Sequence, residues 1–189
     1  DEQADSIFSE NFEQLDAATH VPAGWSFFGG PKTVEVTGER AHAGAHSLKL
    51  VDEDPKNAVG LRSPKIPVEA GEACWVEWWY WAEPGNDQSL YMEFWTEDGT
   101  RTEPPSRSFS CRGSGEWEKH VGRYRTPRGT AAVTIHCNSY STNVATGYFD
   151  DITFGTGAKF IYDRTLKPPV NVKHPCGLYR QEDIQRARG

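Results

Sequence analysis

Three of the seven tryptophans share one face of a single predicted strand, residues 73–82. Successive side chains of a strand point to opposite faces, so the run divides into two sets. One set is Cys74, Val76, Trp78, Tyr80 and Ala82, which we predict to be core. The other set is Trp75, Glu77, Trp79 and Trp81. Indoles beside a carboxylate suit neither a dry core nor a fully wetted surface, so we predict that this second face binds a ligand.

Two further predicted strands, 89–96 and 131–138, repeat the same division. Each places apolar residues on one side and polar or aromatic residues on the other. The outward sets are Tyr91, Glu93 and Trp95 in the first strand, and Thr134, His136 and Asn138, continued by Tyr140, in the second. If these strands share a sheet with 73–82, the outward residues form one groove. Such a groove fits sugars, whose C–H faces stack on aromatic rings and whose hydroxyls bond to amide, imidazole and carboxylate groups.

A catalytic function for the same residues is the competing interpretation. His136, Asn138 and Tyr140 lie on one predicted strand face, and His and Tyr can abstract a proton in a lyase reaction. The chain shows no carboxylate pair with glycosidase spacing, no Gly-x-Ser-x-Gly and no phosphate-binding loop. We therefore predict a binding module without catalytic activity.

The elements that position these residues are predicted to be short antiparallel strands. Seven Trp, seven Tyr and nine Phe stand against one Met, which favours aromatic packing in sheets over a helical bundle. Turn residues separate the candidate strands, and no helical pattern intervenes. The candidates are 33–37, 46–51, 73–82, 89–96, 106–111, 117–125, 131–138 and 147–154. We predict an all-β jelly-roll β-sandwich over residues 1–155.

Residues 156–189 are predicted to be a C-terminal extended linker and the start of a downstream catalytic domain. The stretch contains Lys167-Pro168-Pro169, and proline favours extended backbone. Its last residues, 180–188, have helix-forming composition with acids early and bases late.

The charge distribution argues against nucleic acid as a partner. With −7 for the whole chain and +4 for residues 156–189, residues 1–155 carry −11, whereas nucleic-acid binding requires a basic face. No apolar run approaches the length of a membrane span, so no membrane contact is expected. The acidic body disfavours a highly sulfated glycan. The charge of a glycan ligand nevertheless stays open, because six arginines can form a local cluster: Arg62, Arg101, Arg107, Arg112, Arg123 and Arg125.

The four cysteines lack the spacing of a zinc site. Cys176 lies in the tail, so the body has three, Cys74, Cys111 and Cys137. At most one disulfide is expected within the body, and free buried thiols fit the sequence equally well.

Several short motifs resemble one family of sugar-binding proteins. They are Asn11-Phe12-Glu13, Pro22-Ala23-Gly24-Trp25, residues 41–50, Ala70-Gly71-Glu72 and residues 148–154. Their order resembles that of carbohydrate-binding modules with the galactose-binding-like jelly-roll fold. Separately, residues 174–179 resemble the entry to the catalytic domain of heparinase II/III-like and alginate-lyase-like polysaccharide lyases.

The resemblance implies a structural calcium ion between the first and last strands. The matching positions are Glu13, the loop from Gly44 to Ser47, and Asp151, and their oxygens suit Ca²⁺. Whether Asp150 or Asp151 turns inward is open, and the alternative is that these acids only cap a turn and end a strand. A transition-metal pair of His42 and His46 is not expected, because two imidazoles four residues apart come together only on a helix.

The resemblance further implies a secreted, extracellular or periplasmic module that binds a polysaccharide or oligosaccharide. We expect a monomer that directs a polysaccharide-degrading enzyme, such as a lyase, to its glycan. The alternative is a structural sandwich between domains of a lyase, which packs its aromatic face on a neighbouring domain and binds no sugar.

Overall fold

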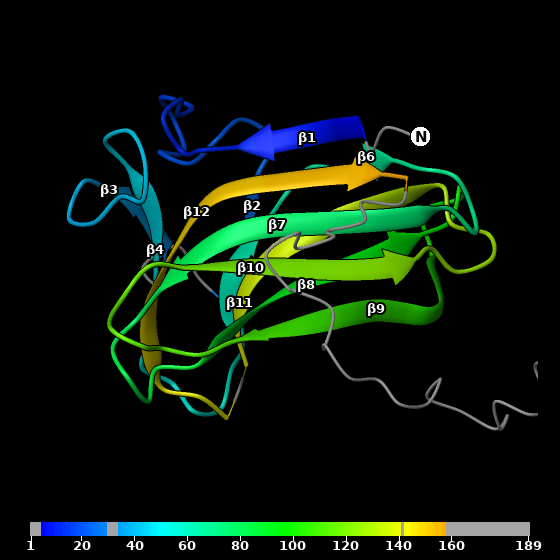
Figure 1. Ribbon diagram of the computed structural model, residues 1–189. Coiled ribbons are helices and arrows are strands. Elements are labelled where there is room, and N and C mark those ends of the chain that lie inside the picture. The colour runs from blue at the N-terminus through cyan, green and yellow to red at the C-terminus, as the bar shows by residue number, and fades with distance from the viewer. Residues whose placement is uncertain (1–4, 30–33, 141, 158–189) are drawn as a thin grey trace, which may run out of the picture. The chain divides into compact units, whose positions relative to one another are not determined.

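The computed structural model describes residues 5–29, 34–140 and 142–157. These residues form two six-stranded antiparallel sheets, visible as two layers in Figure 1. The strands are β1 (Asp5–Glu10), β2 (Ser26–Phe28), β3 (Val34–Thr37), β4 (Ser47–Asp52), β5 (Val59–Arg62), β6 (Ile66–Pro67), β7 (Ala73–Trp81), β8 (Gln88–Trp95), β9 (Arg101–Cys111), β10 (Glu118–Arg125), β11 (Ala132–Ser139) and β12 (Ala145–Thr156). The predicted all-β sandwich is confirmed.

Sequence-distant strands are neighbours in both sheets. The first sheet has the order β10-β7-β12-β4-β3, with β1 also paired to β12. The second has the order β2-β5-β11-β8-β9, with β6 also paired to β11. The chain crosses repeatedly between the layers, as a jelly roll requires.

The core lies between the layers, and strand alternation predicts its residues correctly. Val76, Trp78 and Tyr80 of β7 are buried and belong to one apolar cluster. The alternate residues of β8 and β11 complete that cluster from the other sheet: Leu90, Met92, Phe94, Val133, Ile135 and Cys137. The two sheets therefore present their opposite sets of side chains outward.

The body cysteines are free thiols. Cys74, Cys111 and Cys137 are buried without a disulfide, which decides between the two alternatives left open by the sequence. Burial raises the pKa of the Cys74 thiol to about 12 and that of Cys111 to about 12. Such thiols are unreactive at neutral pH.

Most of the predicted tail lies outside the described residues. The sandwich ends with β12 at Thr156, whereas the linker, Cys176, the lyase-like segment 174–179 and the expected terminal helix fall within 158–189. In the part of the chain that the structure describes, no helix is long and apolar enough to span a membrane.

Candidate functional site

The predicted ligand-binding residues divide between two opposite faces of the sandwich. Trp75, Glu77, Trp79 and Trp81 belong to β7, which pairs with β10 and β12 in the first sheet. The remaining residues belong to β8 and β11, or follow β11, in the second sheet. The prediction of one shared groove is therefore wrong, because it depends on strand partners that alternation along one strand does not specify.

Two indoles of the first sheet are buried, and loop residues cover the ring of Trp81. Trp75 and Trp81 are only 2% and 7% exposed. The guanidinium of Arg40 lies 3.5 Å above the Trp81 ring, and the Trp81 indole donates a hydrogen bond to the Gly115 carbonyl at 2.9 Å. These two indoles point outward from the sheet but do not present a free ring.

Trp79 is half-buried, and one of its faces is already occupied. The imidazole of His42 stacks on it with ring centroids 3.7 Å apart and an interplanar angle of 14°. Trp117 packs edge-on against the same imidazole. Beside them, Glu77 is buried and forms an ion pair with Lys119 at 3.2 Å. The loops before β4 and β10 thus fill most of the face that the sequence indicated as a stacking surface.

A row of polar and aromatic residues crosses all five strands of the main path of the second sheet. The strand register places Ser26, Arg62, His136, Tyr91 and Ser108 side by side in that order. Their side chains point outward, because the alternate residues of the same strands form the core. We call this the second-sheet row.

Aromatic rings lie against His136, in the middle of this row. Tyr91 stacks on His136 with centroids 4.2 Å apart, and Phe28 lies 5.7 Å from the same imidazole. Gly60 allows the Phe28 ring to approach, because a Cβ there would lie 2.5 Å from its tip. Tyr140 is 43% exposed and donates a hydrogen bond from its hydroxyl to Ser108 at 2.8 Å. The rings of Tyr91 and Tyr140 thus flank an outward polar surface.

Beneath these rings lies a buried ionic network. Glu93 is within 2.8 Å of Arg101 and 3.3 Å of His136. Burial acts to raise the pKa of Glu93, but His136, Arg101 and Arg62 outweigh it and hold that pKa below its usual range. Burial lowers the pKa of His136. Glu93 is therefore ionised and His136 neutral at pH 7, with Arg101 as the direct charge partner.

Hydrogen bonds fix the other outward residues of β11. The Trp95 indole donates to the Thr134 hydroxyl at 3.0 Å, and that hydroxyl lies 2.8 Å from Nε2 of His136. Asn138 donates its side-chain amide to Ser89 at 3.3 Å. Because Asn138 is buried, it supports the surface and does not present its amide to a ligand.

Among the residues that the structure describes, two polar atoms of this network have no hydrogen-bond partner. They are Nδ1 of His136 and Oε2 of Glu93, both buried. Oε2 is at ion-pair distance from His136 but lacks a well-aligned hydrogen bond. Buried polar atoms nearly always have a partner, and a water molecule is the partner that fits atoms buried at this depth.

Sequence reasoning missed three residues of the second face. Phe28 and Arg62 come from short strands that were not predicted, and Lys65 comes from the connection after β5. The Lys65 ammonium lies 4.6 Å from the Trp95 ring centroid, and the Arg101 guanidinium lies 5.5 Å from it. Arg62 was recognised only as one of six arginines able to cluster, and its position beside His136 depends on long-range pairing.

The expected calcium residues meet around the loop 42–46. Glu13 Oε1 accepts hydrogen bonds from the backbone N–H groups of Ala45 at 2.7 Å and His46 at 2.9 Å. Gly44 has a φ of +67°, and a Cβ on it would lie 2.3 Å from Glu13 Oε1. The Ser47 hydroxyl instead donates to the Arg40 carbonyl. Glu13 thus holds the loop directly.

Asp150 and Asp151 hold the other side of this loop. Asp150 is fully buried and accepts a hydrogen bond from the His42 N–H at 2.8 Å. Asp151 contacts the His42 imidazole at 2.7 Å and is partly exposed. Among the described residues no three His, Cys, Asp or Glu side chains gather as a metal cluster. The oxygen donors suit Ca²⁺ in type, with Asp150 as the inward carboxylate, and backbone carbonyls would have to complete the coordination.

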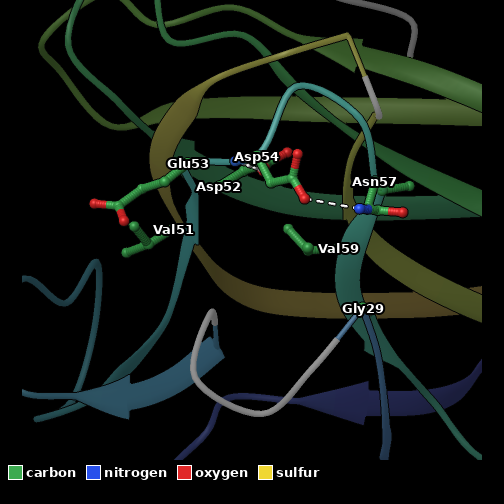
Figure 2. A pocket seen from close by; sticks show the side chains of 8 residues that line it. Gly29, Val51, Asp52, Glu53, Asp54, Asn57 and Val59 are labelled. Atoms are coloured by element: carbon green, nitrogen blue, oxygen red, sulfur yellow. Dashed lines mark hydrogen bonds between the residues drawn. The ribbon is translucent and has the colours of Figure 1, made fainter.

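A cavity of about 760 Å³ lies elsewhere, beside the β4–β5 connection (Figure 2). It is lined by Gly29, Val51, Asp52, Glu53, Asp54, Asn57, Ala58 and Val59. The Asn57 amide donates to Asp54 at 2.7 Å, and Asp52 is buried. Because this lining combines carboxylates with small apolar side chains and has no aromatic ring, the cavity lacks a stacking surface for a sugar.

Solved structures of other proteins share this fold. No protein-family model and no curated protein sequence matches the chain. The CBM22-1 xylan-binding domain of Paenibacillus barcinonensis Xyn10C superposes with a TM-score of 0.57 and 18% identity, covering 81% of this chain and 95% of that one. This chain therefore shares the β-sandwich fold of that domain.

Two structures from Clostridium thermocellum Xyn10B agree with that assignment. The C-terminal family 22 carbohydrate-binding module gives a TM-score of 0.55 at 15% identity, covering 82% of this chain and 96% of that one. The CBM22-1–GH10 modules, complexed with xylohexaose, give 0.57 at 13% identity, covering 81% and 29%. In the last of these structures the matching fold is part of a longer chain that also contains a GH10 module.

Proposed function

We propose that this protein is a non-catalytic module that binds a polysaccharide through the outer face of its second sheet. The observation that carries the proposal is the second-sheet row, which combines outward aromatic rings with polar groups across five strands. The structural similarity to modules that include xylan-binding domains supports this assignment. The loop-covered first sheet is the less suitable face.

A sugar fits this face for physical reasons. Tyr140 offers an exposed ring and Tyr91 the ring face opposite to His136 for C–H faces, while the exposed Ser108 hydroxyl and the Arg62 guanidinium offer hydrogen-bonding groups. A half-buried tyrosine that covers a sugar ring contributes about 1.5 kcal/mol. Two or three such contacts, less the cost of association, give an affinity of about millimolar to high micromolar.

The geometry also favours binding over proton abstraction. His136 is only 2% exposed and lies against the rings of Tyr91 and Phe28. A general base must reach the proton it removes within hydrogen-bond distance, directly or through one water. His136 is better placed to orient Tyr91 and to hold Glu93 than to act on a substrate.

The wider role we propose is targeting. A linked module raises the concentration of its enzyme on the polymer. The proposal includes secretion, a monomeric module, a polysaccharide lyase as the parent enzyme, and a structural calcium ion held by Glu13 and Asp150. The lyase assignment depends on residues 174–179, which lie outside the described residues.

The test is affinity electrophoresis in gels that contain a panel of soluble polysaccharides, including xylan. Tyr91→Ala should lower the affinity for the retarding glycan roughly tenfold. Trp79→Ala is the matched control, because it removes an aromatic ring from the opposite face. Thermal melts establish that both variants are folded.

The two variants separate the possible binding faces. Loss of retardation in Trp79→Ala with normal retardation in Tyr91→Ala would move the site to the first sheet. Absence of retardation of the wild-type protein by every glycan in the panel would favour the interdomain structural sandwich.

A further inference from the structure

Positive charge gathers on the outer face of the second sheet, although the body is strongly acidic. Residues 1–155 carry −11. Against this background, Arg62 stands in the second-sheet row, and Lys65 and Arg101 lie by the ring of Trp95. Glu93 lies between Tyr91 and Trp95 on β8 and is the carboxylate in this part of the face. Three cations therefore lie near one acid.

Two of these cations have no acidic partner in the part of the chain that the structure describes. No carboxylate lies within 4.0 Å of Arg62 or Lys65, whereas Arg101 pairs with Glu93 at 2.8 Å. The only hydrogen bond recorded for the Arg62 guanidinium among these residues runs from Nε to the Ser26 hydroxyl at 3.4 Å. Its terminal N–H groups remain available for another acceptor.

The nearby acids do not neutralise this pair. Glu97 and Asp98 lie in the turn between β8 and β9, where Asp98 accepts a hydrogen bond from the Thr100 backbone N–H at 3.0 Å. Glu103 is exposed in the irregular part of β9, between the residues that pair with Glu93 and Trp95. None of the three is within ion-pair distance of Arg62 or Lys65.

The cations flank the aromatic residues of the face. Arg62 shares a row with Tyr91, and Lys65 contacts Trp95. Tyr91 and Trp95 are four residues apart on β8, which is about 13 Å along the strand. This distance exceeds one pyranose ring, so a chain of sugars that stacks along β8 would meet one cation near each aromatic ring.

We propose that the ligand is an acidic polysaccharide, with uronate carboxylates bound by Arg62 and Lys65. This inference rests on the proposed function of the same face. The planar guanidinium of Arg62 matches a carboxylate with two parallel hydrogen bonds, and Lys65 supplies a second point charge. Trp95 and Tyr91 are both partly exposed, so each leaves part of its ring for a sugar beside the cations.

The test uses two pairs of polymers that differ in charge. Sodium polygalacturonate is compared with its methyl-esterified form, and glucuronoxylan with xylan stripped of its uronate side groups. The wild-type protein should bind at least one acidic polymer roughly tenfold more tightly than its neutral counterpart at low salt. Added NaCl at 0.5 M, a concentration chosen for strong screening, should remove most of that preference.

Variants connect the preference to this face. Arg62→Gln should abolish most of it, and Arg62→Lys should retain part, because lysine keeps the charge but loses the paired hydrogen bonds. Lys65→Gln, at an exposed position, gives a second reading that does not depend on the fold tolerating a change at Arg62. Arg40→Gln is the matched control, since it removes an exposed arginine from the loop over the first sheet.

The outcomes distinguish this inference from the proposed function. Equal binding of acidic and neutral polymers that still depends on Tyr91 would overturn the inference and leave glycan binding in place. A charge preference that survives both Arg62→Gln and Lys65→Gln would also overturn it. Failure to bind any of the four polymers, or any other glycan, would overturn both.

Discussion

His136 and Glu93 link the proposed binding face to the stability of the fold. Burial keeps the pKa of His136 below its unfolded value of about 6.5. Glu93 favours protonation of His136, whereas Arg62 of β5 and Arg101 of β9 oppose it. Glu93 has its pKa held below about 4.5. Neutral imidazole and ionised carboxylate are therefore the forms that the folded protein stabilises.

We predict that acidification destabilises the fold through His136. Below about pH 6.5 the His136 imidazole binds a proton in the unfolded chain, whereas it stays neutral in the folded protein. The free energy of unfolding therefore decreases as the pH is lowered. Glu93 adds a loss at lower pH, as pH falls through its depressed pKa. Urea midpoints from pH 8 to pH 5 should fall more steeply for the wild-type protein than for His136→Gln. Parallel curves for the two proteins would contradict this origin of the pH dependence.

Adjacent tryptophans on β7 should differ in their contribution to stability. Trp78 is 1% exposed, and its indole donates to Cys111 Sγ at 3.3 Å, so Trp78→Ala should cost about 3–5 kcal/mol of unfolding free energy. Trp79→Ala loses mainly the stack with His42 and should cost about 1–2 kcal/mol. Chemical denaturation of both variants measures the difference, and equal losses would show that the loops support the fold as much as the core does.

The buried thiols should resist alkylation in the folded protein. Peptide mapping after treatment with iodoacetamide should show Cys74, Cys111 and Cys137 unmodified under native conditions and modified after unfolding in urea. A native disulfide between any two of them would contradict the free thiols seen in the structure.

At the scale of elements, the loop 42–46 is held by side chains from both ends of the described chain. Glu13 follows β1, and Asp150 belongs to β12, yet both accept hydrogen bonds from this loop. Glu13→Ala removes the acceptor of two backbone N–H groups and a contact with His46, so it should lower the melting temperature. A melting temperature equal to that of the wild-type protein would show that water replaces the carboxylate without loss.

Calcium is predicted to stabilise the same loop. A ligand bound only by the folded state raises stability, so exhaustive chelation should lower the melting temperature of the wild-type protein. Asp150→Asn should remove this response, because it replaces the buried carboxylate. Elemental analysis that finds no calcium, together with a melt unchanged by chelation, would contradict the proposal.

Alternation predicts which side of a strand faces the core, but it does not predict sheet membership. It placed Val76, Met92 and Ile135 inward correctly, because that pattern is local to each strand. The separation of β7 from β8 and β11 depends on pairing between distant segments. Coverage of Trp79 by His42 depends on a loop more than thirty residues earlier in the sequence. The site was therefore predicted in residue types and not in arrangement.

The expected inward aspartate shows where alternation itself fails. β12 has an irregular register between Asp150 and Thr153, and Asp151 has a φ of 47°. A positive φ is uncommon for residues other than glycine, with Asp and Asn among the exceptions, and it breaks the period of two. Asp150 is consequently the buried residue of the pair, and nothing in the pattern of Asp150-Asp151 distinguishes the two from sequence alone.

For the whole molecule, the two outer faces differ in how their residues are covered. The first sheet carries the larger number of indoles, but its loops fold back over them. The second sheet carries fewer indoles, together with a buried Glu93–His136 pair and two cations that have no carboxylate within ion-pair distance among the described residues. A surface with these features on an acidic body favours association with a polar, negatively charged polymer.

Chemical-shift mapping by NMR tests the central claim most directly. A ¹⁵N-labelled protein is titrated with an oligosaccharide of the polymer that gives the strongest retardation in gels. We predict that the largest backbone shifts follow β5, β8 and β11 around Arg62, Tyr91 and His136, with small changes around Trp79. Shifts concentrated on β7 and β10, with β8 and β11 unaffected, would contradict glycan binding by the second sheet.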